Sequence, residues 1–193
     1  MLGKKRLALT LAVILLLLLP LTGCKLQYAG ESFSLKIGPN GGGSLSVVYK
    51  NMGSAQEKFY LRTKDLDELR LAFRNDEYIK KAAKENIKII NHRLDFIDYT
   101  INGNIEAETD DYKNFFRLFT NYTFEVADRI YITPLNGTVT RATLSEGGEI
   151  VVRNNKYSFA WGLDTKDLSF TASYKVLGAS FKNELRKQYQ DKK

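Results

Sequence analysis

Apolar and polar residues alternate along much of this chain, which is the two-residue period of half-buried β-strands. The alternation is clear over residues 33–37 and 45–49, and the segment Pro39-Asn-Gly-Gly-Gly43 separates the two runs. Glycine-rich segments of this kind typically form turns between antiparallel strands. The pattern predicts a hairpin with a glycine turn. A phosphate-binding loop is disfavoured because such a loop opens a helix, whereas a second strand follows here.

The middle of the chain changes to a helical period. Apolar residues fall three or four positions apart over residues 65–85, with a break at Asn75-Asp76, and this predicts two consecutive helices or one kinked helix starting near Asp65. Residues 87–101 are rich in β-branched and aromatic side chains, with one slip in the alternation that a bulge would explain. Asn102-Gly103 follows and predicts the turn of a second hairpin.

A short helix is predicted over residues 111–119. Its four closely spaced apolar residues, between Phe115 and Phe119, fit either a helix packed in the core, which we favour, or an exposed patch for a membrane or a partner. At the end of the chain, Phe181, Leu185 and Tyr189 share one face of a predicted basic helix.

Strands dominate the remaining C-terminal part. They are predicted over residues 122–132, 139–144, 150–152, 157–161 and 168–176, with turns at glycine and asparagine clusters between them. The chain is therefore expected to form one α+β domain over residues 33–178, built on a mainly antiparallel sheet of about seven to nine strands with helices on one face. Residues 179–193 are expected to form a basic C-terminal helix or tail.

The N-terminus follows none of these patterns. Lys4, Lys5 and Arg6 precede a run over residues 7–19 that is apolar apart from Thr10, which is the arrangement of a secretory signal peptide. A membrane-spanning helix needs about 20 apolar residues, so this run is short for a span.

The segment ends in Leu21-Thr22-Gly23-Cys24, which resembles the lipobox of bacterial lipoprotein precursors. The resemblance implies that residues 1–23 are a lipoprotein signal peptide and that a peptidase cuts between Gly23 and Cys24. It also implies that Cys24 carries the lipid, which places the protein on the outer face of the cytoplasmic membrane or on an outer membrane. Residues 24–32 are then expected to be the lipidated cysteine and a polar tether. The alternatives are an uncleaved membrane anchor and a conventional signal peptide in which Cys24 is incidental.

Composition agrees with export. Cys24 is the one cysteine of the chain, so no intramolecular disulfide can form, and 11 Tyr, 11 Phe and one Trp supply a large apolar core instead. Removing the signal peptide with its three cations lowers the formal net charge from +7 to +4. This mild charge gives no support for nucleic-acid binding, but it is compatible with an anionic membrane surface.

Candidate catalytic groups are few. His92 is the single histidine and lies in a strand-like run, so neither a catalytic triad nor a metal site can be built around other histidines. Acidic residues cluster at Glu106, Glu108, Asp110 and Asp111 without the spacing of a calcium loop. We therefore predict no metal and no cofactor.

The later segment Tyr157-Ser-Phe-Ala-Trp161-Gly-Leu, followed by Leu168-Ser-Phe170, resembles LppM-type bacterial lipoproteins, whose biochemistry is unassigned. The missing catalytic set and the permanent membrane tether together favour a non-catalytic binding or assembly module that engages an envelope protein, glycan or lipid. Two alternatives stay open: an envelope hydrolase that uses the carboxylates at residues 106–111, and a lipid carrier with an apolar cavity.

Overall fold

A computed structural model describes residues 26–119, 121–135, 137–176 and 178–190. In chain order its elements are β1 (Leu26–Ile37), β2 (Gly43–Ser54), α2 (Phe59–Arg74), α3 (Glu77–Lys84), β3 (Ile87–Ile97), β4 (Thr100–Thr109), the 3₁₀ helix η1 (Tyr112–Asn114), α4 (Phe115–Leu118), β5 (Tyr122–Val126), β6 (Ile130–Pro134), β7 (Val139–Leu144), β8 (Glu149–Arg153), β9 (Lys156–Trp161), β10 (Asp167–Tyr174), β11 (Ala179–Ser180) and α5 (Lys182–Gln190).

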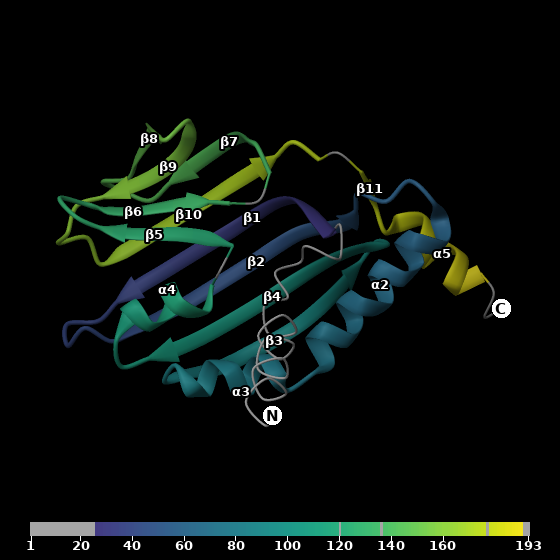
Figure 1. The fold of residues 1–193 in the computed structure, drawn as a ribbon, viewed down its shortest axis with the longest axis horizontal. Helices are drawn as coiled ribbons and strands as arrows, with labels where there is room; N and C mark the ends of the chain where they lie inside the picture. The colour runs from purple at the N-terminus through teal and green to yellow at the C-terminus, as the bar shows by residue number, and fades with distance from the viewer. Residues whose placement is uncertain (1–25, 120, 136, 177, 191–193) are drawn as a thin grey trace, which may run out of the picture.

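The largest layer is an antiparallel sheet in the order β3-β4-β2-β1-β10-β7, with β11 added beside the end of β2 (Figure 1). β1 and β2 form the predicted hairpin, and Leu35 pairs with Leu45 while Phe33 pairs with Val47. Gly41 in the turn has φ +83°, a conformation that favours glycine. The sequence pattern and the observed register therefore agree for the central hairpin.

A second, four-stranded sheet in the order β5-β6-β9-β8 packs on one face of the large sheet. Aromatic rings join the two layers: Phe33 of β1 contacts Tyr122 of β5 with ring centroids 5.3 Å apart, and Phe159 of β9 contacts Phe170 of β10 at 4.5 Å. Burial of such rings is the main stabilising contribution expected for a chain without a disulfide.

Helices cover the same inner face of the large sheet. Gly103 of β4 faces Phe73 of α2, and α3 packs against β3 (Figure 1). Phe115, Leu118 and Phe119 of the short α4 segment are buried in the core, as the core interpretation predicted. The predicted fold class, an α+β fold with mainly antiparallel sheets and helices on one face, is thus confirmed.

The predicted tether was wrong from Leu26 onward, because β1 already begins at that residue. Leu26 pairs with Ser54, and Tyr28 and Glu31 are buried. Gln27, Glu31 and Ser32 gave this segment a polar composition that concealed a strand.

The predicted turn at Asn102-Gly103 was also wrong. The chain turns at Asp98 and Tyr99, both with left-handed φ angles (48° and 60°), and Gly103 lies inside β4. A Cβ atom at Gly103 would lie 2.9 Å from Phe73 Cζ, so this glycine makes room for α2 instead of forming a turn. A bulge is present in β3, but it lies between Ile89 and Asn91. The slip in the alternation, at Phe96 and Ile97, coincides instead with the end of β3 before the turn.

Two other boundaries differ from the predictions. Residues 122–132 form not one strand but the paired strands β5 and β6, and the two sheets divide the C-terminal strands between them. The first of the two predicted helices starts at Phe59 and not near Asp65. Asp65 is buried inside α2, where its carboxylate accepts a hydrogen bond from Ser54 Oγ at 2.5 Å.

The C-terminal helix α5 is held beside α2, as its predicted amphipathic face requires. Phe181 and Leu185 are buried, and Arg62 Nε of α2 donates to Glu184 Oε1 at 2.6 Å. Glu184 is itself buried, so this ion pair links two helices that are distant in sequence.

Candidate functional site

The outer face of the large sheet carries small hydroxyl side chains. In β1 the residues Phe33 and Leu35 point inward to the core, so Ser32 and Ser34 point outward between them. Pairing brings hydroxyls of neighbouring strands together: Ser34 pairs with Ser46 on one side and Ser169 on the other, and Ser32 pairs with Thr171. Thr171 pairs in turn with Thr143 of β7. The register thus assembles a hydroxyl-lined surface from four strands.

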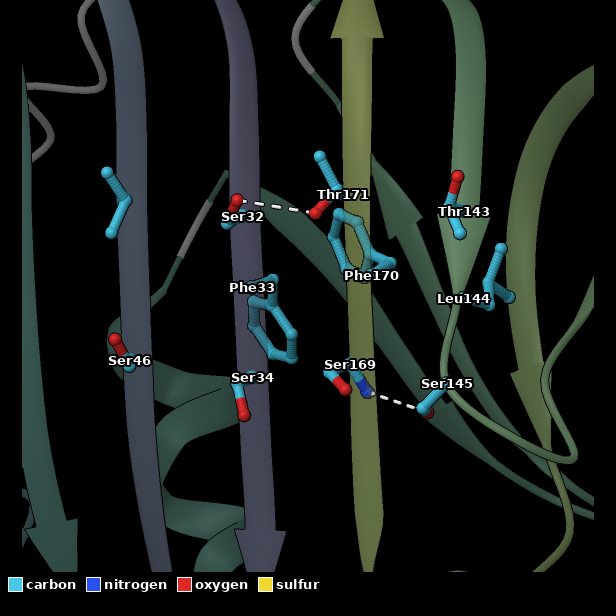
Figure 2. A pocket seen from close by; sticks show the side chains of 11 residues that line it. Ser32, Phe33, Ser34, Ser46, Thr143, Leu144, Ser145, Ser169, Phe170 and Thr171 are labelled. Atoms are coloured by element: carbon cyan, nitrogen blue, oxygen red, sulfur yellow. Dashed lines mark hydrogen bonds between the residues drawn. The ribbon is translucent and has the colours of Figure 1, made fainter.

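This surface is hollowed. A hollow of about 410 Å³ lies over β2, β1, β10 and β7 (Figure 2). A second one of about 430 Å³ shares Ser34 and Ser46 with it, and a third of about 450 Å³ shares Ser44 and Glu108 with the second. Because neighbouring hollows share lining residues, we describe the three together as one open groove, hereafter the hydroxyl groove, that crosses the strands from β7 to β3. Five strand spacings give it a length of roughly 24 Å.

Hydrogen bonds fix one side of the hydroxyl groove. Ser145 Oγ accepts from the Trp161 indole and from the Ser169 backbone N–H, both at 3.1 Å, and donates to the Asp167 carbonyl at 2.9 Å. Ser32 and Thr171 share a hydroxyl contact of 3.3 Å, which Figure 2 shows above the Ser145 bond. Hydrogen bonds within the protein therefore position the groove wall along β10.

Other hydroxyls in the groove are available to a ligand. Within the described residues, the side chains of Ser34, Ser46 and Thr143 have no hydrogen-bond partner. A hydroxyl group both donates and accepts, so these positions can pair with neutral polar groups of either kind.

Charged residues lie at the β4 end of the hydroxyl groove. Glu106 and Glu108 point outward from β4, two residues apart, and Lys36 lines the same hollow. The other two candidate carboxylates have different positions: Asp110 lines the third hollow, and Asp111 caps η1 by accepting from the Lys113 N–H at 3.0 Å. The acidic cluster of the sequence is thus divided between the groove and a helix cap.

Glu31 is a buried carboxylate that the sequence did not single out. It lies on the inner face of β1, where it accepts hydrogen bonds from the phenols of Tyr122, at 2.8 Å, and Tyr174. Burial raises the pKa of Glu31, although the phenol hydrogen bonds lower it in part, and burial also raises the pKa values of both tyrosines. With no exposed surface, Glu31 has no access to a substrate, so it is a core residue.

His92 lies between two aromatic rings. Phe73 of α2 and Tyr78 of α3 stack on its imidazole with centroid distances of 4.4 and 4.8 Å. Burial lowers the pKa of His92. This placement fits the structural role expected for a single strand histidine.

The candidate lipid-attachment residue Cys24 and the cleavage site at Gly23 lie outside the described residues. In the described part of the chain, no three His, Cys, Asp or Glu side chains gather where they could hold a metal ion. Among the helices that the structure describes, none has the length and apolar character needed to cross a bilayer.

Sequence reasoning missed the hydroxyl groove. Its signal was present in the alternation of residues 32–36 and 44–48, where serine occupies most of the outward positions between apolar residues. Such positions look like ordinary solvent-facing residues until strand order places three serine-bearing strands together.

Comparisons with protein-family models, with curated proteins and with solved structures each returned no match.

Proposed function

We propose that this protein is a non-catalytic binding module of the bacterial cell envelope, anchored by a lipid on Cys24, whose hydroxyl groove binds an extended, uncharged polar polymer such as an envelope glycan strand. The observation that supports this ligand class is the groove lining of small hydroxyls on a rigid sheet. The lipobox segment Leu21-Thr22-Gly23-Cys24 supports the anchor.

The chemistry of the groove favours a neutral ligand. Its centre, around Ser34, Ser46 and Thr171, carries hydroxyls and no charge, and the charged side chains gather toward β4. A polyhydroxyl chain offers donors and acceptors along its length, which match hydroxyls that face solvent without a protein partner. Small side chains also leave room for a polymer to approach the sheet closely.

The hydrolase alternative rests on the position of Glu106 and Glu108 beside the groove. Hydrolysis by paired carboxylates needs the two groups to flank the scissile bond, about 5–5.5 Å apart in retaining enzymes and about 6.5–9.5 Å apart in inverting ones. Glu106 and Glu108 point from the same strand on the same side, and among the described residues no other carboxylate lines the hollow that they share, so no pair flanks a ligand there. We therefore favour binding over cleavage.

Binding of soluble cell-wall glycan fragments, followed by NMR chemical-shift changes, tests the proposal. We expect shifts at Ser32, Ser34, Ser46 and Thr171, and at least a tenfold loss of affinity in the double variant Ser34→Leu/Ser46→Leu, which fills the groove. Thr123→Leu is the matched control because Thr123 is an exposed strand threonine on the second sheet.

Two outcomes would count against this function. Equal binding by the groove variant and the wild type would place the ligand elsewhere. Cleavage of the glycan, lost in Glu106→Gln/Glu108→Gln without a change in thermal stability, would establish the hydrolase instead.

A further inference from the structure

One end of the molecule combines exposed aromatic side chains with cations. Four large apolar side chains are 39–54% exposed there: Phe59 at the start of α2, and Phe96, Ile97 and Tyr99 around the β3–β4 turn. Cations lie over the rings: Arg70 is 5.7 Å from the Phe96 centroid, Arg186 is 5.4 Å from that of Tyr99 and Lys187 is 5.0 Å from that of Phe59. These seven residues are called the basic-aromatic end.

The basic-aromatic end is also where the described chain begins. Leu26 pairs with Ser54, and Ser54 pairs with Ala179 directly before α5. On the other side of β2, the Asn51 N–H donates to Asn102 Oδ1 near the β3–β4 turn at 2.9 Å. Figure 1 shows β11, α5 and the start of α2 together at this end of the sheet.

The position of Leu26 limits how far this end can lie from a lipid on Cys24. Leu26 is two positions after Cys24, with Lys25 between them, and two extended residues span at most about 7 Å. Aromatic side chains beside arginine and lysine are the combination found at the level of lipid headgroups. A bilayer is therefore the surface that the anchor itself would bring to these residues.

We propose that the basic-aromatic end lies on the surface of an anionic bilayer. Phe59, Phe96, Ile97 and Tyr99 enter the headgroup region, and Arg186 and Lys187 face the lipid phosphates. Arg70 is partly neutralised by Asp67 at 3.6 Å, so α5 supplies most of the attraction. This orientation rests on the proposed anchor at Cys24.

The orientation positions the hydroxyl groove. Ser34 lies eight residues along β1 from Leu26, and a strand rises about 3.3 Å per residue. The groove is then about 26 Å along the strand from the membrane-facing end. The groove would then bind a ligand that runs parallel to the membrane at this distance above the bilayer, and not at its surface.

Vesicle binding by residues 24–193 without an acyl chain tests the surface separately from the anchor. This part contains the whole described core, which runs from Tyr28 to Leu185. We expect binding to vesicles with 30% anionic lipid and weak binding to neutral vesicles. Near an anionic membrane each cation contributes about 1 kcal/mol, so Arg186→Gln/Lys187→Gln should lower the affinity roughly 30-fold. Lys80→Gln/Lys81→Gln on α3 removes the same charge elsewhere and should change it little.

Tryptophan quenching in the lipidated protein tests the orientation. With brominated anionic vesicles, Tyr99→Trp should add emission that is quenched by the lipid, over the constant emission of the buried Trp161. Tyr157→Trp, on β9 at the other end of Figure 1, should add emission that is not quenched.

Equal affinities of the two charge variants, or equal quenching at both tryptophans, would overturn the proposed orientation. Self-association through Tyr99 with no binding to vesicles would overturn it in favour of a second copy of the chain. None of these results bears on the anchor. An absent anchor would be detected separately, as an intact mass without acyl chains on Cys24.

Discussion

Glu31 occupies an inward-facing position of β1 where the strand pattern would place an apolar residue. Its carboxylate is tolerated because the Tyr122 and Tyr174 phenols donate to it, and each such bond offsets part of the cost of burial. Tyr28 joins the same cluster: its ring contacts Tyr49 at 4.8 Å and Tyr174 at 5.3 Å. The cluster therefore cross-links β1, β2, β5 and β10 through polar tips on apolar bodies.

The raised pKa of Glu31 makes stability depend on pH. Between pH 4.5, the ordinary pKa of a glutamate, and the raised pKa of Glu31 in the folded protein, the folded protein keeps a proton that the unfolded chain releases. The contribution of Glu31 to the free energy of unfolding is thus fully present below pH 4.5 and is lost as pH rises. We expect the free energy of unfolding of Glu31→Gln, measured with urea, to increase relative to that of the wild type as the pH rises from 4.5 to 8. Parallel pH profiles of the two proteins would contradict this role.

His92 supplies a second residue-level test with the opposite dependence. Its pKa is lowered below the ordinary 6.5 by burial, so its contribution to stability is present above that pH and is lost as pH falls. Because the chain has one histidine, its imidazole signals in a proton NMR titration need no assignment by mutation. We expect a midpoint below 6.5, and His92→Phe should keep the ring stack while removing the loss of stability in acid. A midpoint at or above 6.5 would contradict the burial of the imidazole against Phe73 and Tyr78.

At the scale of elements, β11 and α5 are attached to the end of β2 by a close backbone contact. Gly53 pairs with Ser180, and a Cβ at Gly53 would lie 2.8 Å from Ser180 Cα. The contact requires glycine because backbone atoms, unlike a flexible side chain, cannot move aside. Arg62 and Glu184 then hold α5 on α2.

Gly53→Ala should therefore loosen the C-terminal segment. We expect a destabilisation of about 1–3 kcal/mol, as for other overpacked sites, and faster hydrogen exchange in α5 measured by mass spectrometry. Gly38→Ala is the control, since its nearest non-neighbouring atom, the Gly42 carbonyl oxygen, is 3.5 Å away. Unchanged exchange in α5 would show that side-chain contacts alone hold the helix.

Strand and helix positions were largely predictable from the sequence, because alternation and helical periodicity record which face of each element is buried. The central hairpin, the paired helices and the strand over residues 157–161 were all expected. The turn at Asp98-Tyr99 was not, since Asn102-Gly103 is the stronger local signal and only packing against Phe73 explains why it stays extended. A contact between residues distant in sequence therefore determined where this hairpin turns.

The candidate site was less predictable than the elements. Serines at residues 32, 34, 44 and 46 are unremarkable in sequence. The β1–β2 hairpin places them side by side, and Ser169 and Thr171 join them only because β10 returns to pair with β1. That pairing joins positions more than a hundred residues apart. The division of the C-terminal strands between two sheets has the same cause, because local patterns state which residues are buried but not against which layer.

For the whole molecule, the two faces and the two ends of the large sheet differ. One face is covered by helices and the second sheet, while the other presents the hydroxyl groove. One end carries cations and exposed aromatic rings beside the start of β1. These asymmetries fit a protein that is held at one end and binds along one face. The proposed membrane orientation and the proposed envelope function both rest on a lipid at Cys24.

The proposed lipid anchor is tested most directly by the intact mass of the membrane-extracted protein, compared with that of a Cys24→Ser variant. If Cys24 is lipidated, the mass should equal that of residues 24–193 plus two or three acyl chains. In the variant, both the added mass and membrane retention should be lost. A full-length mass, or a cleaved chain without acyl groups, would contradict the anchor and with it the envelope function proposed here.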